Sequence, residues 1–387
     1  MGTKPYTLFK RGDIWYCRFR DIDGERATPK STGETARARA EQWAVSYLQK
    51  GQGRIVKSEL VTLDGFSRGF FDWSSPWATD KKARGMRISE NHCLQRADLL
   101  KNHIIPALGK MRVSSINRAV IKDFRNKLFE AGYSGNTINK CLSALKSILE
   151  AAEERGLIQY VPRIDRAAEN PKVKGILTPD EVRRLFSFQW MSKPSRNHPA
   201  KPLFVEQAGN LLAVTTGLRL SEIQGLFVGD VSFPDNYITV RRSWDNRLLQ
   251  INEATKTGRE RIVFFPGTVK AALLELVDAN PYKSNPNSFL FFGDTQDKPK
   301  DRRGFTVSLA SALEQIGISR ESQRARVLSF HGHRHFLNSL LINSRVPLQK
   351  LQSIVGYTTM NMTEHYYRPD DMQDVLQITE GIFKEAL

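Results

Sequence analysis

The chain has 387 residues, and its content of 40% hydrophobic and 26% charged residues is typical of a globular protein with two or three domains. Lysine and arginine outnumber acidic residues by 58 to 41, mostly within the first 176 residues, which favours a nucleic-acid partner over a merely basic surface. Three scattered cysteines exclude a disulfide framework or a cysteine-based zinc site. No run of 18 apolar residues occurs, so we expect a cytoplasmic protein.

Residues 6–50 predict a small sheet followed by a helix. The pattern indicates strands at 6–9, at 14–20 and near 25–29, and then a helix at 35–48. Along the second strand, aromatic or apolar residues alternate with basic ones, which gives the sheet a packing face and a cationic face. A cationic sheet face can lie in a DNA groove, and the alternative is a solvated charged surface. The candidates for DNA contact on this strand are Arg18 and Arg20.

Residues 65–160 are predicted to be mainly helical. Ser115 is expected to cap a helix that Gly132 ends, and a second helix is expected from near Thr137 to Gly156. Apolar residues at helical spacing mark the core faces of the two helices. They are Ile116, Val120, Phe124 and Leu128 in the first helix, and Ile138, Leu142, Leu145 and Leu149 in the second. The basic residues beside them are either DNA contacts or plain solvated surface: Lys122, Arg125, Lys140 and Lys146.

Residues 161–176 are polar and contain Pro162 and Pro171, a composition typical of an exposed hinge. Thr178 follows as a predicted helix cap, with Pro179 at the first helical position and two acidic residues after it. A new folded region is therefore expected to begin near residue 177.

Two segments of this region contain basic residues in positions suited to an anion. In 216–223, an apolar helix is expected to end near Gly217, and Arg219 then lies in the first turn of the next helix. A guanidinium group and the free amides of a helix end together form an anion site. In 255–259, Lys256 lies between two predicted strands and thus on or near a hairpin tip.

Two further segments add histidines and tyrosines. The segment 331–335 enters a predicted helix, with His331 and Arg334 three residues apart on one turn. Its three histidines are spaced by two, which suits a metal only on a strand, so we expect no metal site. The segment 355–367 ends in Tyr366 and Tyr367. Taken singly, such an arginine is usually on the surface and such a tyrosine is usually in a core.

In this order, the four segments closely resemble the C-terminal signature of the tyrosine recombinases, in particular the phage-type integrases. The family has His or Trp where Tyr357 stands, and a tyrosine can still donate a hydrogen bond to a phosphate oxygen. Nine residues beyond Tyr357, as in the family pattern, lies Tyr366 rather than Tyr367. The family's Arg…Lys…His-x-x-Arg…His/Trp…Tyr series falls on Arg219, Lys256, His331, Arg334, Tyr357 and Tyr366.

The resemblance implies a multidomain α+β fold. A small N-terminal three-stranded sheet plus helix is followed by a helical core-binding domain and by a mainly α catalytic domain with a small antiparallel sheet. The expected parts are an arm-type DNA-binding domain (1–52), a linker (53–64), a core-binding domain (65–165), a hinge (166–176), and a catalytic domain with a C-terminal interaction tail (177–387).

The resemblance also assigns roles that suit the cleavage of a phosphodiester. Arg219 and Arg334 would hold its two non-bridging oxygens. Tyr366, a phenol with an ordinary pKa of about 10, would attack with His331 as proton acceptor or hydrogen-bond partner. Lys256 would protonate the leaving 5′-oxygen. The 3′-phosphotyrosyl bond conserves the energy of the phosphodiester, so no ATP, metal or other cofactor is expected.

The implied activity is site-specific integration and excision of a mobile element. We expect a homotetramer on double-stranded DNA with core-type and arm-type sites, an accessory DNA-bending protein or excisionase, and no membrane partner. An apolar stripe follows Tyr366, and it docks either on a neighbouring subunit or on its own domain. Two other functions stay open: a type IB-like topoisomerase or telomere resolvase, and a DNA-binding regulator whose site has decayed.

Overall fold

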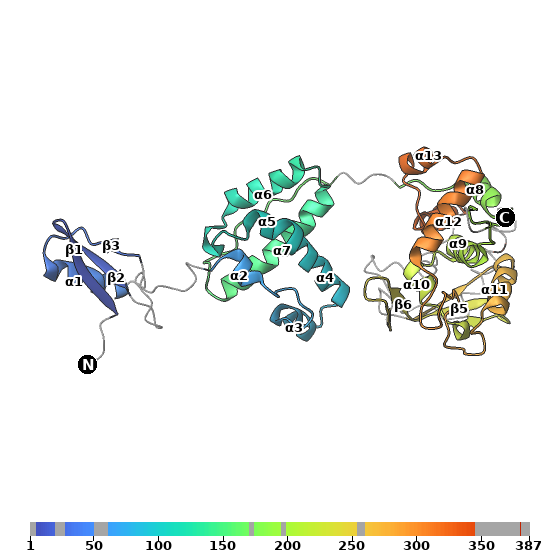
Figure 1. The fold of residues 1–387 in the computed structure, drawn as a ribbon, viewed down its shortest axis with the longest axis horizontal. Coiled ribbons are helices and arrows are strands. Elements are labelled where there is room, and N and C mark those ends of the chain that lie inside the picture. Colours follow the sequence, from blue (N-terminus) through green and yellow to red (C-terminus); the bar gives the residue numbers. More distant parts are fainter. Residues whose placement is uncertain are drawn as a thin grey trace. The chain divides into compact units, whose positions relative to one another are not determined.

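The structure, a computed structural model, divides into two compact units, Met1–Pro171 and Lys172–Leu387 (Figure 1). The first unit contains two separate hydrophobic clusters and the second unit contains one. Among the residues that the structure describes, no helix combines the length and the apolar character needed to cross a membrane. The described residues are 5–19, 28–49, 61–169, 174–194, 199–253, 260–344 and 380.

An antiparallel sheet in the order β1-β2-β3 begins the first unit, and helix α1 packs on it. Cys17 and Phe19 of the second strand are buried against Ala44 of the helix, and Trp43 and Tyr47 complete this small cluster. The inward residues of the strand thus form the predicted packing face. The elements are β1 (Tyr6–Arg11), β2 (Ile14–Phe19), β3 (Lys30–Ser31) and α1 (Arg37–Gln49).

The third strand lies at Lys30–Ser31 and not near 25–29, where we expected it. Pro29 lacks the N–H group that a paired strand residue donates, so the pairing starts only after it. Lys30 pairs with Cys17 of β2, and the next backbone N–H beyond the strand, from Thr32, donates to the Trp15 carbonyl at 3.0 Å.

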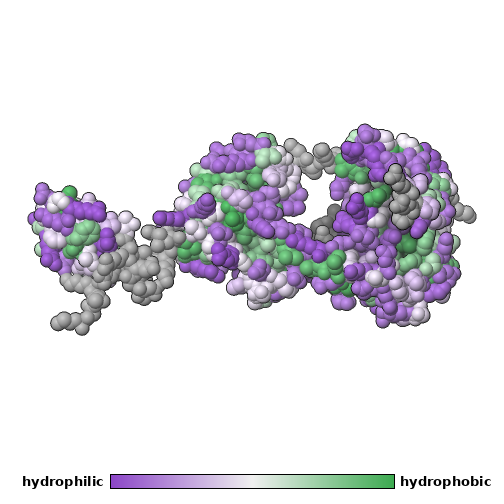
Figure 2. Space-filling view, viewed as in Figure 1, coloured by the Kyte–Doolittle hydropathy of each residue, from purple (hydrophilic) through white to green (hydrophobic). Residues whose placement is uncertain are grey.

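A helical bundle forms the rest of the first unit. The longest helix supplies much of its core, and the predicted stripe Ile138, Leu142, Leu145 and Leu149 is buried there as expected. On the face that Figure 2 shows, apolar residues reach the surface of this bundle in patches between hydrophilic ones. Its elements are α2 (Leu63–Ser67), α3 (Pro76–Ala83), α4 (Glu90–Leu99), a π-helical turn η2 (Leu100–Ile104), α5 (Ile105–Leu108), a 3-10 turn η3 (Val113–Ser115), α6 (Arg118–Glu130) and α7 (Gly135–Glu154).

Two boundaries in this bundle differ from the sequence prediction. The cap of α6 is Asn117 and not Ser115, because the Asn117 Oδ1 atom accepts hydrogen bonds from the backbone of Ala119 and Val120 at 3.0 and 3.1 Å. The buried residues of α6 shift accordingly to Ile121, Phe124 and Leu128. Residues 61–64, expected at the end of a linker, belong to the bundle instead, since Leu63 is fully buried.

Arg96 joins α4 to α7 inside the bundle. Its Nε donates to the Nε2 atom of His92 at 2.9 Å, and its two terminal nitrogens donate to the hydroxyls of Ser147 and Ser143 at 3.1 and 3.2 Å. The guanidinium also lies over the ring of Trp77 at 5.4 Å. Because the His92 nitrogen accepts, this imidazole is neutral, and burial together with the Arg96 charge lowers its pKa.

All three cysteines lie in the first unit and are buried free thiols. Burial raises the pKa of Cys17 and Cys141 to about 11. It also raises the pKa of Cys93. The thiols are therefore protonated at neutral pH.

Helix α9 lies at the centre of the second unit, where it contacts α11, α12 and α14. A sheet in the order β4-β5-β8 and a two-stranded pair β6-β7 accompany the helices. The elements are α8 (Pro179–Phe186), α9 (Phe204–Thr216), α10 (Leu220–Gln224), η4 (Val228–Asp230), β4 (Val231–Ser232), β5 (Tyr237–Val240), β6 (Ser243–Asp245), β7 (Gln250–Asn252), β8 (Arg261–Phe264), α11 (Gly267–Ala279), α12 (Arg302–Gln315), α13 (Arg320–Ala325) and α14 (Gly332–Asn343).

The predicted helix start at Thr178 is confirmed. Thr178 and Glu181 form a reciprocal capping box at the beginning of α8, with Pro179 at the first helical position. Arg326 then fixes the same turn, because it donates to both Glu181 carboxylate oxygens at 2.7 and 2.8 Å. The expected fold class, α+β with a small N-terminal sheet, a helical bundle and a mainly helical C-terminal unit, is confirmed.

Replacement of Arg96 by alanine is expected to destabilise the bundle by roughly 2–4 kcal/mol, because several charge-assisted hydrogen bonds and a ring contact are lost together. Hydrogen exchange on peptides of α4 and α7 measures this loss. Arg118→Ala is the control, since Arg118 is exposed and its ion pair with the half-buried Asp165 lies near the surface. Equal protection in the two variants would show that Arg96 does not hold α4 and α7 together.

Candidate active site

The candidate site begins at the turn between α9 and α10. Gly217 ends α9 in the left-handed conformation, with φ of +69°, which residues with a side chain rarely adopt. The chain can therefore reverse within two residues, so that Arg219 becomes the residue that precedes α10. The carbonyl of Gly217 accepts a hydrogen bond from Nη1 of Arg334 at 3.0 Å. Two residues of the predicted motif are thus attached to one turn.

Glu222 holds the side chain of Arg219 in place. Its carboxylate is 1% exposed and accepts from Nη1 of Arg219 at 2.8 Å and from the Arg219 backbone N–H at 3.0 Å. Arg261 of β8 donates to the same two oxygens at 2.7 and 3.2 Å. Burial raises the pKa of Glu222, but the adjacent Arg261 and Arg219 charges outweigh this effect and hold the pKa below its usual value. Two guanidinium groups thus share one ionised carboxylate.

Arg334 and His331 come from the start of α14. Arg334 is 2% exposed, whereas His331 precedes the helix and is exposed. The surroundings of His331 lower its pKa to about 4, first through desolvation and then through the charges of His335, Lys174, Arg334 and Arg219. The imidazole is therefore neutral at pH 7 and can accept a proton.

Lys174 and His335 lie beside this pair, and the motif did not include them. The rings of His331 and His335 are perpendicular, with centroids 4.9 Å apart. Burial lowers the pKa of His335, and the Lys174 charge lowers it further. Gly175 anchors this segment, because its N–H donates to the Arg326 carbonyl at 2.7 Å and a Cβ there would come within 2.4 Å of the same oxygen.

His333 has a structural role. It is 2% exposed, and its Nε2 atom lies 2.9 Å from Oδ1 of Asn210 on α9. The Asn210 amide nitrogen donates to the Glu206 carbonyl, so the imidazole donates and Asn210 accepts. Burial lowers the pKa of His333 to about 3. This histidine therefore ties α14 to α9.

The DNA-contact candidates differ in their environment. Arg18 is half-buried, with its guanidinium over the Phe9 ring at 5.3 Å. Arg125 donates to the Asp165 carbonyl at 3.2 Å and thus also supports the bundle. Lys122 and Lys140 are exposed, and Lys146 is exposed and pairs with Glu150 at 2.9 Å. Four predicted site residues lie outside the described residues: Arg20, Lys256, Tyr357 and Tyr366.

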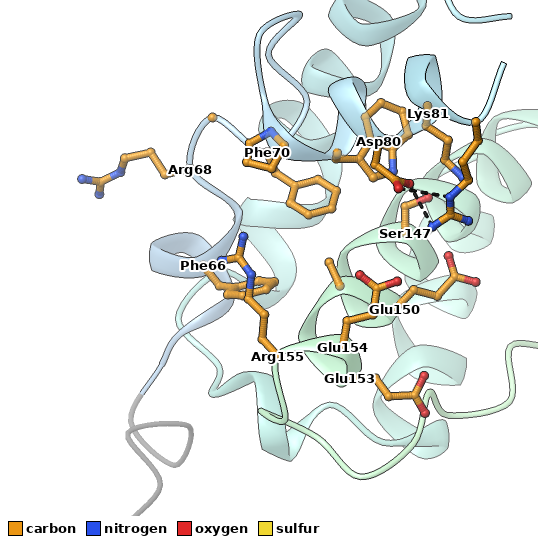
Figure 3. Close-up of a pocket in the computed structure, with 15 residues that line it drawn as sticks. Phe66, Arg68, Phe70, Asp80, Lys81, Ser147, Glu150, Glu153, Glu154 and Arg155 are labelled. Atoms are coloured by element: carbon orange, nitrogen blue, oxygen red, sulfur yellow. Dashed lines mark hydrogen bonds and ion pairs between the residues drawn. The ribbon is translucent and has the colours of Figure 1, made fainter. Parts of the chain in front are cut away.

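The helical bundle also contains a cavity of about 590 Å³ (Figure 3). Its aromatic wall includes Phe66 and Phe70, and Arg155 lies over the Phe66 ring at 5.2 Å. Figure 3 shows Arg68 pointing away from the cavity, and Asp80 pairs with Arg84, one turn further along the same wall, at 3.0 Å. These contacts are not those of a nucleophile with its acid and base. Among the described residues, the members of the predicted motif lie in the second unit: Arg219, His331 and Arg334.

Comparison with protein families gives two matches. Residues 176–373 match the model described as the Phage integrase family. Residues 70–129 match the model described as the Phage integrase, N-terminal SAM-like domain. Among curated proteins, the tyrosine recombinase XerC of Roseiflexus castenholzii is 26% identical over 245 residues, which cover 62% of this chain and 70% of that protein. The transposase from transposon Tn916 of Enterococcus faecalis is 23% identical over 287 residues, which cover 70% and 66%.

Solved structures show the same fold. A Tn1549 transposon integrase in complex with a circular intermediate DNA has a TM-score of 0.59 and 21% identity, covering 78% of this chain and 97% of that one. A lambda integrase tetramer bound to a Holliday junction has a TM-score of 0.54 and 17% identity, covering 94% and 95%.

The neutral state of His333 predicts a pH dependence. Its pKa in the folded unit, about 3, is below the ordinary value of about 6.5, so its stabilising effect is complete above pH ~6.5 and is lost as the pH falls toward 3. We expect His333→Gln, whose amide can still donate to Asn210, to flatten the decline by up to about 1.4 kcal/mol per pH unit. Hydrogen exchange on α9 and α14 peptides between pH 7 and 4.5 measures the slope, with His103→Gln in the first unit as control. An unchanged slope would exclude His333 as the titrating group.

Proposed function

Because this chain belongs to the phage integrase family, we propose that it is a site-specific DNA recombinase that cleaves and rejoins strands to integrate and excise a mobile element. The observation that carries the proposal is the shared turn at Gly217, to which Arg334 is hydrogen-bonded and from which Arg219 projects. One arginine that projects from this turn and a second that is hydrogen-bonded to it are suited to a single phosphodiester.

The two arginines would hold the scissile phosphate. Arg219 uses Nη1 for Glu222 and keeps 22% of its side chain exposed, so its other nitrogens can face a ligand. One net positive charge remains in the group of Arg219, Arg261 and Glu222, and Arg334 adds a second. Negative charge that develops on the non-bridging oxygens would meet these preorganised donors, which lowers the barrier to attack.

The covalent step is assigned to Tyr366. Its phenolic oxygen would attack the phosphorus, and the bond from phosphorus to the 5′-oxygen would break. Neutral His331 would accept the phenolic proton or hold it in a hydrogen bond, and Lys256 would protonate the 5′-oxygen. Tyr357 would donate a hydrogen bond to a phosphate oxygen. A 5′-hydroxyl of another strand then reverses the reaction, so the bond energy is conserved without metal or ATP.

The partners follow from the same proposal. A lambda integrase forms a tetramer on a Holliday junction and a Tn1549 integrase binds circular intermediate DNA, which supports a homotetramer on double-stranded DNA for this chain. We retain the predicted division into arm-binding, core-binding and catalytic domains as part of the proposal. The exposed lysines of the bundle would contact phosphates of the core site: Lys122, Lys140 and Lys146.

Tyr366→Phe is expected to abolish a covalent protein–DNA adduct, because phenylalanine has no oxygen to attack phosphorus. Tyr367→Phe is the matched control and should retain the adduct. The substrate is a nicked suicide duplex built on the sequence that the protein selects from a random pool of duplex DNA. The reaction is run with a chelator and without ATP, and adducts are resolved by denaturing electrophoresis.

The outcomes of this experiment separate the possible functions. An adduct that forms equally on arbitrary sequences would indicate a topoisomerase. No adduct on the selected duplex, together with tight binding, would indicate a DNA-binding regulator and contradict the proposal. Loss of the adduct in Tyr367→Phe and not in Tyr366→Phe would move the nucleophile by one residue.

The apolar stripe after Tyr366 predicts a role in assembly. Deletion of 372–387 is expected to abolish ordered multimers on DNA, because the buried apolar area of this tail would no longer join neighbouring subunits. Native electrophoresis of protein–DNA complexes measures the change, with the polar substitution Lys384→Gln as control. Unchanged multimers would mean that the tail docks on its own domain or on nothing.

A further inference from the structure

Arg261 does not belong to the family motif, but it binds the carboxylate that also binds the motif residue Arg219. Its side chain, at the start of β8, is 13% exposed and donates to both carboxylate oxygens of Glu222. Glu222 belongs to α10, which is 39 residues away in the sequence. The carboxylate therefore joins the sheet to the helix that begins at Arg219.

We propose that Arg261 is a positioning residue for strand cleavage: through Glu222 it holds the guanidinium of Arg219 in the orientation that binds the scissile phosphate. This inference rests on the proposed function. Arg261 affects both the orientation and the effective charge of Arg219, because the two arginines share the oxygens of Glu222.

Arg261 prevents the Glu222 carboxylate from rotating. Oε1 of Glu222 accepts from Nη1 of both arginines, and Oε2 accepts from the Arg219 backbone N–H and from Nη2 of Arg261. Each oxygen thus has one donor from each arginine, so the carboxylate cannot rotate without losing contacts. Without Arg261, the carboxylate is free to form a bidentate ion pair with Arg219. That pair would occupy guanidinium nitrogens of Arg219 that are needed to bind the phosphate.

Arg261 also determines how much positive charge Arg219 retains for binding the DNA phosphate. A buried carboxylate with a single arginine cancels the charge of that arginine. With Arg261 present, two positive charges face one negative charge, so Arg219 keeps an effective positive charge for an anion. Arg261 thus acts on the phosphate through Arg219, although it does not itself bind the DNA.

A second buried pair in the same unit provides a matched control. Arg242 is 12% exposed and binds Asp230, which is 4% exposed, at 3.0 Å. Its guanidinium lies over the Phe227 ring at 4.0 Å. The pair resembles Arg261–Glu222 in burial and residue type, but its contacts include no motif residue. Loss of Arg242 therefore reports the purely structural effect of removing a buried arginine.

The test compares two substrates that differ in one charge. Both are nicked suicide duplexes on the selected sequence. One has a normal scissile phosphate, and the other has a methylphosphonate, in which a methyl group replaces one non-bridging oxygen and removes the negative charge. Cleavage rates at saturating protein are measured for wild type, Arg261→Gln, Arg261→Lys, Arg219→Gln and Arg242→Gln, each relative to wild type on the same substrate, and duplex affinity is measured separately.

We expect Arg261→Gln to slow cleavage of the normal phosphate by on the order of 100-fold, with duplex affinity changed by less than about threefold. On the methylphosphonate, the loss should shrink to within about threefold, as for Arg219→Gln, because little charge remains to be stabilised. Arg261→Lys keeps the charge but cannot donate from two nitrogens to both carboxylate oxygens, so its cleavage rate should lie between those of wild type and Arg261→Gln. Arg242→Gln should show the same ratio on both substrates.

Equal losses of Arg261→Gln on the two substrates would overturn the inference, because a structural defect does not depend on substrate charge. If Arg261→Gln does not fold, Arg261→Lys decides, and wild-type rates on both substrates would overturn it. Failure of the wild-type protein to form an adduct on any duplex is a different result, because it contradicts the proposed function itself.

Discussion

A single left-handed residue, Gly217, ends helix α9 and leaves its carbonyl free for the buried guanidinium of Arg334. The same reversal brings Arg219 to the start of α10, one turn before the carboxylate that binds it. Helices α9 and α14 are further joined through Asn210 and His333. The relative position of the two motif arginines is thus fixed by the packing of α9, the central helix of the unit, and a side chain at position 217 would strain all of it.

Positive charge is concentrated around this turn, and this concentration costs stability. Desolvation and then the charges of Lys174, Arg334 and Arg219 lower the pKa of His331, so its imidazole is neutral. The single carboxylate of Glu222 is shared between two arginines. Neighbouring positive charges repel one another, so the packing of the fold must supply the free energy that keeps these side chains together. An anionic ligand relieves this repulsion, which is the usual property of a preorganised electrostatic site.

Local sequence rules predicted much of the fold, but they misplaced some boundaries and missed contacts between distant residues. The apolar stripe of α7 and the capping box at Thr178 follow from spacing alone. Ser115 and Asn117 are both good caps, and spacing could not choose between them. The motif proposed Arg219, His331 and Arg334 as site residues, and the structure brings Arg219 and Arg334 to one turn. It did not indicate Glu222 or Arg261, because their contact links residues 39 positions apart and charged residues usually lie on the solvent-exposed surface. Lys256, Tyr357 and Tyr366 remain predictions.

The burial of every cysteine has a practical consequence for following this protein at work. Cys17, Cys93 and Cys141 are shielded thiols with raised pKa values, so the natural chain should react slowly with maleimide dyes under native conditions. A cysteine introduced at an exposed position of the second unit would then be the dominant labelling site, with no native residue replaced. Fluorophores attached in this way to different copies would report distances within an assembly on DNA, in real time and from a chain whose cores are intact.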